Sequence, residues 1–174
     1  MTRAGQPSSW LLENLDLLPP AARTLDVACG RGRHALFLAA RGFPVEAVDR
    51  DPARVAALSS VAERLGLPVR ARVADLEGAP VDLEPGGYDL VLVFHYLHRP
   101  LFPALRRALA PGGLLLYETF TVEQARRGKP TNPAFLLEPG ELRRLVAPLE
   151  VLREREGELE GRMVAGVAAR RPAD

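Results

Sequence analysis

The sequence predicts a doubly wound α/β domain, in which a mainly parallel sheet carries helices on both faces. Apolar strand-like runs alternate along the chain with segments whose apolar residues recur at helical spacing. A small-residue turn at 29–32 joins the first such run directly to a helix, and residues 88–94 form an apolar run typical of a strand buried on both faces. At 174 residues we expect a single domain over 1–174, with an N-terminal cap helix within 1–20 and the sheet core in 21–174.

Capping residues and apolar spacing set the expected elements. Ser8 or Ser9 can cap the first helix, and Asp51-Pro52 is a helix start with an Asp N-cap and Pro at the first helical position. The last two strands, with a turn at 157–161, are typical of a hairpin. In chain order, the expected helices span 10–18, 33–42, 52–65, 101–109 and 138–147, and the expected strands span 25–28, 44–49, 69–74, 88–94, 114–117, 150–156 and 163–169.

Composition narrows the class of protein. The net charge is +1, and Lys129 is the only lysine, so nothing indicates a basic surface for nucleic acid or an anionic membrane. No apolar run approaches the roughly 20 residues of a membrane span. The N-terminus lacks the apolar region of a signal peptide, and the single cysteine, Cys29, rules out an intrachain disulfide. We expect a cytoplasmic protein with no nucleic-acid or membrane partner; the patterns do not indicate an oligomeric state.

Three acidic residues fall at or near the carboxyl ends of the first three expected strands. In open parallel sheets, ligands bind outside these ends, where the strand order reverses. Asp49 could accept both hydroxyls of a ribose, Asp75 could accept an exocyclic amine, and Asp26 could face an ammonium group. Each residue alone is equally an ordinary turn or capping residue. Their joint placement indicates S-adenosylmethionine, which carries all three groups.

The turn between the first strand and its helix supports a bound cofactor. Gly30 and Gly32 allow positive φ and let a ligand approach the backbone closely. Free N–H groups at the start of the helix can meet ligand oxygens. The alternative is a tight strand-to-helix turn that binds nothing.

Five motifs in the right order resemble those of class I S-adenosylmethionine-dependent methyltransferases. They are Asp26-Val-Ala-Cys-Gly30-Arg-Gly32, Val45-Glu-Ala-Val-Asp49, Val73-Ala-Asp75-Leu76, Tyr88-Asp-Leu-Val-Leu-Val93 and Ala110-Pro-Gly-Gly113-Leu-Leu-Leu. The resemblance covers about residues 20–170. It implies a seven-stranded sheet of order 3-2-1-4-5-7-6 with the last-numbered strand antiparallel, S-adenosylmethionine as cofactor and S-adenosylhomocysteine as product.

The same resemblance implies which residues bind the cofactor, and it implies no metal. The implied cofactor-binding residues are Asp26, Ala28, Cys29, Gly30, Gly32, Arg33, His34, Asp49, Arg50, Asp75, Leu76 and Phe94. Ala28 departs from the family, which often has glycine there, and so narrows the approach to the cofactor. Cys29 is expected to be a small filler of the turn rather than a nucleophile.

Within the class, the chain is similar to small tellurite-resistance-type methyltransferases and their uncharacterised relatives. The similarity rests on Pro7-Ser-Ser-Trp10, on Ala28-Cys-Gly-Arg-Gly-Arg-His34 and on the segment 128–140. It implies that the acceptor is a small molecule or a metalloid oxyanion.

Residues after the fourth strand should lie beside the transferred methyl group. Either His95 or His98 could be a general base, and Arg99 could pair with an anionic acceptor. The alternatives are hydrogen-bonded loop histidines and a solvated arginine. Thr119 and Phe120 could line the pocket wall, whereas Tyr117 is expected to pack in the sheet.

The longest irregular stretch suggests a lid. Residues 121–135 leave the sheet edge where the ligand should sit, and they carry Arg126, Arg127 and Lys129. An exposed charged loop is the alternative.

Two other functions remain open from the sequence. Gly30-Arg-Gly32-Arg-His-Ala35 fits the G-x-G-x-x-A pattern of dinucleotide-binding folds, with Asp49 about 20 residues on. The chain could also be a non-catalytic S-adenosylmethionine-binding subunit or sensor, because no catalytic base is certain.

Overall fold

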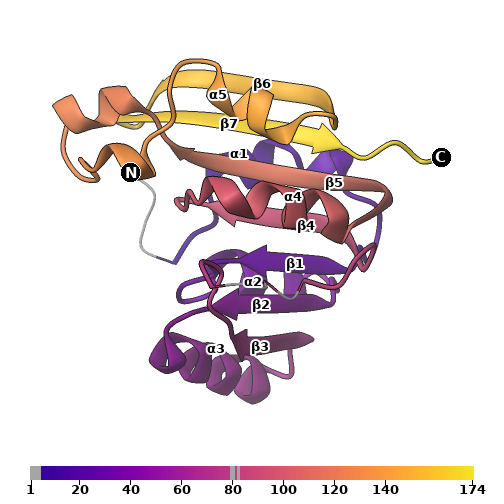
Figure 1. Cartoon of the computed structure of the whole chain (residues 1–174). Helices are drawn as coiled ribbons and strands as arrows, with labels where there is room; N and C mark the ends of the chain where they lie inside the picture. The colour runs from indigo at the N-terminus through magenta and orange to yellow at the C-terminus, as the bar shows by residue number, and fades with distance from the viewer. Residues whose placement is uncertain (1–4, 79–80, 82) are drawn as a thin grey trace.

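Seven strands form one sheet in a computed structural model of the chain (Figure 1), which describes residues 5–78, 81 and 83–174. Residues 1–4, 79, 80 and 82 lie outside the described part. The strand order is β3-β2-β1-β4-β5-β7-β6, which confirms the expected order. The strands are β1 (Thr24–Val27), β2 (Val45–Asp49), β3 (Val69–Val73), β4 (Tyr88–Phe94), β5 (Leu109–Phe120), β6 (Glu150–Leu159) and β7 (Arg162–Arg170).

The first five strands are parallel, and β7 runs antiparallel to both of its neighbours, β5 and β6. β1 lies at the centre of the parallel part, with β2 on one side and β4 on the other. The strand order therefore reverses between β1 and β4. In open α/β sheets this reversal marks where a ligand binds, beyond the carboxyl ends of the strands.

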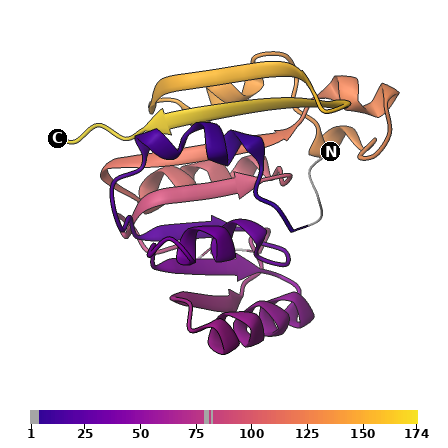
Figure 2. The same ribbon diagram turned by 180° about the vertical axis from the view of Figure 1, so that it is seen from behind.

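Helices cover both faces of the sheet. α4 and α5 lie on the face turned to the viewer in Figure 1, and α1 and α2 lie on the opposite face, seen in Figure 2. None of the described helices has the length and apolar character needed to cross a bilayer. The helices are α1 (Ser9–Glu13), α2 (Arg33–Ala39), α3 (Pro52–Leu65), α4 (Phe102–Ala108) and α5 (Glu141–Val146), with short 3₁₀ turns η1 (Leu15–Leu17), η2 (Arg99–Leu101), η3 (Val122–Arg126) and η4 (Pro133–Phe135).

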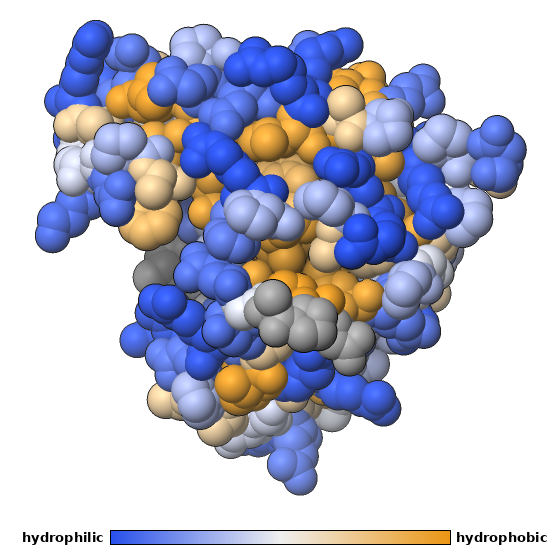
Figure 3. All heavy atoms as spheres, in the orientation of Figure 1, coloured by the Kyte–Doolittle hydropathy of each residue, from blue (hydrophilic) through white to orange (hydrophobic). Residues whose placement is uncertain are grey.

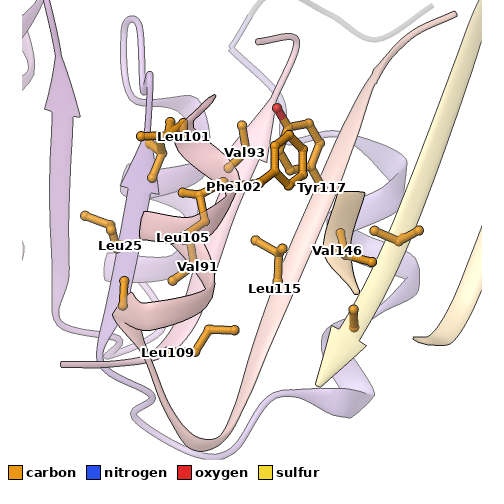
Figure 4. Packing of buried hydrophobic residues seen from close by; sticks show 14 of the residues in the cluster. Leu25, Val91, Val93, Leu101, Phe102, Leu105, Leu109, Leu115, Tyr117 and Val146 are labelled. Atoms are coloured by element: carbon orange, nitrogen blue, oxygen red, sulfur yellow. The ribbon is translucent and has the colours of Figure 1, made fainter. Parts of the chain in front are cut away.

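Alternate residues of each central strand enter different halves of the core. Val91 and Val93 of β4 face α4 and α5, where they pack near Phe102 and Leu105 (Figure 4). Leu90 and Leu92 belong to the cluster on the opposite face, with Trp10 of α1. This alternation follows from the two-residue period of a strand. It explains why β4 is apolar from Leu90 to Phe94, as expected for a strand buried on both faces.

Hydrophilic side chains cover much of the outer surface over α4 and α5, with apolar residues showing between them (Figure 3). Large apolar side chains that are exposed among the described residues are scattered rather than clustered: Leu12, Leu65, Val73 and Phe135. Single exposed apolar residues are normal in globular proteins.

The N-terminal helix is shorter than expected. Ser8 is the N-cap, and its Oγ accepts a hydrogen bond from the Trp10 N–H at 3.2 Å. α1 ends at Glu13 because Asn14 leaves helical geometry and its Nδ2 donates to the Trp10 carbonyl at 2.7 Å. Side chains of this type compete with the helix for backbone groups. The chain continues as the 3₁₀ turn η1 up to Leu17.

Two turns near the end of the chain also differ from the expectation. β5 begins at Leu109, ahead of the strand expected at 114–117, because Gly112 and Gly113 hydrogen-bond to Arg171, just after β7. The β6–β7 hairpin closes at Glu160 and Gly161, whose φ values are 49° and 81°. Two central residues with positive φ match the twist of antiparallel strands, so this tight turn replaces the longer one expected at 157–161.

Candidate active site

A cavity of about 390 Å³ opens beyond the carboxyl ends of the parallel strands. Every parallel strand or the segment after it contributes to its wall. The lining residues are Ala28, Asp49, Arg50, Arg54, Asp75, Leu76, Glu77, His95, Tyr96, Leu97, Thr119, Phe120, Pro130 and Phe135. The cavity thus brings together six of the predicted site residues, which are Ala28, Asp49, Arg50, Asp75, Leu76 and His95.

Asp49 joins the glycine turn to the start of α3 at the cavity wall. Its Oδ2 accepts the Gly30 N–H at 2.8 Å, and its Oδ1 accepts the Asp51 N–H at 2.9 Å. The carboxylate is 6% exposed. An ionised carboxylate oxygen has a second lone pair, so each oxygen can accept a further hydrogen bond from a ligand. The two backbone donors therefore fix the orientation of a carboxylate that still has acceptor capacity.

The turn after β1 depends on left-handed backbone conformations. Gly30 and Gly32 have φ values of 57° and 79°. A Cβ on Gly32 would overlap the side chain of Leu58, so glycine there lets α2 start against α3. Ala28 also has a positive φ, 54°, although it carries a side chain. This conformation costs about 1 kcal/mol or more in a residue other than glycine, and it occurs at the cavity wall.

Asp26 lies under the turn rather than on the cavity wall. It is 2% exposed, and its Oδ2 has no hydrogen-bond partner among the described residues. Burial raises the pKa of Asp26 to about 7, with a smaller contribution from the charge of Asp49, while a hydrogen bond from the Ala35 N–H and the charge of Arg33 oppose the rise. A buried acceptor without a donor is uncommon in proteins and fits a missing cationic partner.

Three of the predicted cofactor residues lie in the core instead of the cavity wall. The thiol of Cys29 is buried, and burial raises its pKa, so it is not a ready nucleophile. His34 stacks on Phe94 with ring centroids 4.1 Å apart, and its Nε2 accepts the Ser8 N–H at 3.1 Å. Burial lowers the pKa of His34 to about 3, so the ring is neutral. His34 and Phe94 therefore hold the N-terminal segment against α2.

His95 lies at the cavity wall immediately after β4. Its φ is 55°, its ring stacks on Phe120 at 4.7 Å, and its N–H donates to the Glu118 carbonyl at 2.9 Å. Burial, and then the charges of Arg33 and Arg162, lower its pKa to about 4. The imidazole is neutral at pH 7, so it has a ring nitrogen able to accept a proton.

His98 and Arg99 do not line the cavity. His98 Nδ1 lies 3.8 Å from Glu77 Oε1. Arg99 Nε donates to Glu141 Oε1 at 2.5 Å, and its other nitrogens donate to the carbonyls of Ala134 and Leu136. The structure thus gives Arg99 a different role from the expected pairing with an acceptor: it joins the 3₁₀ turn η4 to α5.

Sequence reasoning missed several cavity residues. Arg54, in the first turn of α3, and Glu77 were not predicted, and their proximity to Asp49 and Asp75 in the sequence was the available signal. Tyr96 and Leu97 line the wall, as expected for the segment after the fourth strand. The Tyr96 hydroxyl has no hydrogen-bond partner among the described residues, and burial, together with Glu77, raises its pKa to about 12. Pro130 and Phe135 belong to the segment 121–135, which was expected beside the ligand, but neither residue was singled out within it. Thr119 and Phe120 line the wall as expected, whereas Tyr117 is buried and donates to the Tyr96 carbonyl at 2.6 Å.

Comparison with known proteins places this arrangement in a family. Residues 24–113, just over half of the chain, match the family described as "Methyltransferase domain". The chain is 38% identical over 116 residues to trans-aconitate 2-methyltransferase of Variovorax paradoxus, covering 63% of this chain and 42% of that one. It is 33% identical over 143 residues to Hemagglutinin 1 of Eikenella corrodens, covering 77% of this chain and 46% of the other. It therefore spans less than half the length of these relatives.

Solved structures agree on the fold. The crystal structure of TehB from Haemophilus influenzae superposes with a TM-score of 0.79 at 21% identity, covering 95% of this chain and 62% of that one. At this identity the likeness concerns the fold, and the family match and the five ordered motifs carry the assignment. The chain is also 28% identical over 86 residues to the probable S-adenosyl-L-methionine-dependent methyltransferase TehB of Haemophilus influenzae, covering 48% of this chain and 29% of that one. The chain belongs to the methyltransferase domain family.

Proposed function

We propose that the chain transfers a methyl group from S-adenosylmethionine to a small-molecule acceptor. The observation that carries the proposal is Asp49, a carboxylate fixed by two backbone N–H groups beside the glycine turn and facing the cavity. Family membership supports this cofactor over the nicotinamide dinucleotide that the G-x-G-x-x-A pattern left open.

The residues present fit the three polar parts of this cofactor. Asp49 would accept the ribose hydroxyls with its remaining lone pairs. Asp75, whose Oδ1 accepts the Glu77 N–H at 3.0 Å, would accept the adenine amine. Asp26 offers a buried oxygen without a donor, which an ammonium group would satisfy. A Cβ placed on Gly30 would meet nothing closer than 3.9 Å, so the turn presents bare backbone to the ligand.

The chain's own part in the reaction is positioning and the exclusion of water. When bound, the cofactor supplies an electrophilic methyl group on a sulfonium. Phe120 and Phe135, both on the cavity wall, would help to exclude water from the bound ligands. His95, with its neutral imidazole at the cavity wall, would accept a hydrogen bond from an acceptor that arrives protonated and so orient it; its lowered pKa makes it a weak base. No protein nucleophile is needed, in keeping with the buried thiol of Cys29.

The proposal also covers the class of acceptor, the binding partners and the location in the cell. The cavity is of a size that suits small ligands, because such sites typically hold about 300–1,000 Å³. With a net charge of +1, we propose no nucleic-acid partner and no membrane partner, and a cytoplasmic location. The similarity to tellurite-resistance-type enzymes supports an anionic or metalloid acceptor.

Calorimetric titration of S-adenosylhomocysteine tests the cofactor site. We expect Asp49→Asn to lower affinity on the order of tenfold or more, because a charged acceptor of two ligand hydroxyls becomes a neutral amide. Asparagine is preferred to alanine because it can still accept one of the two backbone N–H groups. Asp51→Asn is the matched control, since it keeps an N-cap and Asp51 is absent from the cavity wall. If folded Asp49→Asn binds S-adenosylhomocysteine with unchanged affinity, Asp49 does not bind the ribose hydroxyls.

One observation favours a second candidate, a cofactor-binding subunit or sensor without turnover. Of the three predicted catalytic residues, only His95 lines the cavity in the described part of the chain. Incubation with S-adenosylmethionine and a panel of thiols, amines and oxyanions separates the candidates. An enzyme forms S-adenosylhomocysteine with at least one acceptor at a rate that His95→Gln lowers. A sensor binds the cofactor and forms none.

A further inference from the structure

A second, smaller cavity of about 30 Å³ lies behind His95. It is bounded by the N-terminal segment, the start of α2, the end of β5 and the β6–β7 turn. The lining residues are Ser8, Ser9, Arg33, His95, Glu118, Leu159, Glu160, Arg162 and Val164. Because His95 lines both cavities, a group held in the small one would lie next to the acceptor end of the large one.

Two arginines supply positive charge to this small cavity. Burial, and then the neighbouring charge of Arg162, lower the pKa of Arg33. The charges of both arginines also lower the pKa of His95. Arg33 donates to the Gln6 carbonyl at 3.1 Å. In residues 5–78, 81 and 83–174, neither arginine forms an ion pair within 4 Å of a carboxylate. Two like charges held close together stabilise the fold little and favour an anion between them.

The carboxylates nearby are already engaged. Glu118 is 2% exposed; its Oε1 accepts the Ser8 hydroxyl at 2.9 Å, and its Oε2 accepts from Arg155 at 2.5 Å. Glu160 at the rim has interactions of its own. Glu118 thus pairs directly with Arg155. The charges of Glu118 and Asp26 also raise the pKa of Arg33, but by less than burial and Arg162 lower it, so the Arg33 and Arg162 pair presents positive charge to His95.

We propose that Arg33 and Arg162 form the subsite for an anionic group of the methyl acceptor, a carboxylate or a small oxyanion. The inference rests on the proposed function and names the chemical class of its acceptor. A guanidinium group binds planar or tetrahedral oxyanions through parallel N–H donors. The cavity has room for one such head group and is too small for an aromatic ring. The acceptor would be held with its anionic end in the small cavity and its reacting atom near His95.

Anion binding to the protein saturated with S-adenosylhomocysteine tests the subsite. Trans-aconitate serves as the carboxylate probe and sulfate as the oxyanion probe, with ionic strength held constant by chloride. We expect at least one probe to bind and Arg162→Gln to weaken it on the order of tenfold or more, because a charge-assisted contact is lost. Arg162→Lys should retain part of the affinity. Arg64→Gln, an exposed arginine in the last turn of α3, is the matched control.

The rival use of these arginines is to hold the carboxylate of the cofactor itself. In that case Arg162→Gln would weaken S-adenosylhomocysteine but not 5′-methylthioadenosine, which lacks the amino-acid part, and the acceptor subsite would be overturned. Failure of both probes to bind the wild-type complex would also overturn it. Failure of S-adenosylhomocysteine to bind the wild-type protein would instead count against the proposed function, and the anion titration can then be made without cofactor.

Discussion

Asp26 is the residue whose charge state should control cofactor binding. With a pKa raised to about 7, mainly by burial, its carboxyl is protonated in acid and ionised above neutrality. Only the ionised form attracts an ammonium group. We therefore expect the affinity for S-adenosylhomocysteine to rise by about tenfold between pH 6 and pH 8, since the binding-competent fraction rises by that factor.

Two comparisons isolate Asp26 from other titrating groups. Asp26→Asn should flatten the pH dependence, and 5′-methylthioadenosine, which has no ammonium, should show little of it in the wild-type protein. Calorimetric titrations across the pH range give both results. An equally steep dependence in Asp26→Asn would show that another group is responsible.

For individual residues, the sequence predicted which positions lie near the cavity better than it predicted where their side chains point. Asp49 and Asp75 could be placed at the cavity because the ends of parallel strands must meet at one edge. Phe94 precedes His95, but successive side chains of a strand point to opposite faces, so Phe94 enters the core beside His34. The role of Arg99 depends on Glu141, more than forty residues later, and no local pattern indicates that pairing.

Among the elements, the segment 121–135 has a fixed part and a part that reaches the cavity. Gln124 anchors the first part: its Nε2 donates to the Lys129 carbonyl at 3.1 Å and its Oε1 accepts the Met163 N–H at 2.8 Å. Arg126 pairs with Glu123, and Arg127 pairs with Glu158. The arginines expected to carry charge to the acceptor are thus engaged elsewhere on the surface.

The later part of this segment is where we expect a response to ligand. Phe135 is 48% exposed and lines the cavity. Phe135→Ala should weaken S-adenosylhomocysteine severalfold, because covering even part of an aromatic ring is worth about 1 kcal/mol. Amide exchange in 131–136 should slow in the complex. The double variant Arg126→Ala, Arg127→Ala is the control and should change neither the affinity nor the amide exchange. If Phe135→Ala also leaves the affinity for S-adenosylhomocysteine unchanged, the segment is an ordinary surface loop.

On the scale of the whole molecule, the N-terminal helix is part of the sheet's stability. Trp10 Nε1 donates to the Val167 carbonyl at 3.2 Å, and Arg155 lies over the indole at 4.6 Å. A Cβ on Gly166 would lie 3.0 Å from the Trp10 ring, so glycine there permits close packing of α1 on β7. Ser8, the N-cap of this helix, hydrogen-bonds to both His34 and Glu118 beside the site.

We expect Gly166→Ala to destabilise the protein by about 1–3 kcal/mol, the usual cost of overpacking. Thermal or denaturant unfolding measures the change. Trp10→Phe in the Gly166→Ala background should recover part of the loss, because the smaller ring makes room for the methyl group. If the two changes are simply additive, the contact with Trp10 is not the cause.

The global topology was predictable because five motifs fix the order of the parallel strands, and the hairpin supplies the antiparallel one. The residues at which β5 and β6 begin and end could not be predicted. They depend on hydrogen bonds to other segments of the chain, such as the one between Gly113 and Arg171. The segment 121–135 was placed beside the ligand, but Pro130 and Phe135 could not be singled out within it, because an irregular segment has no periodicity that reveals which residues face the cavity.

Two reactive side chains occur once each in this chain, and both lie at the active-site edge of the sheet. Cys29 is buried in the glycine turn, and Lys129 is exposed beside the cavity residue Pro130. An amine-reactive fluorophore would therefore modify one side chain besides the N-terminal amine, and it would do so without any engineered residue. Slow modification of Cys29 by a thiol reagent would report opening of the turn. The unmodified sequence thus carries its own pair of labelling points, an exposed amine next to a cavity residue and a buried thiol in the glycine turn.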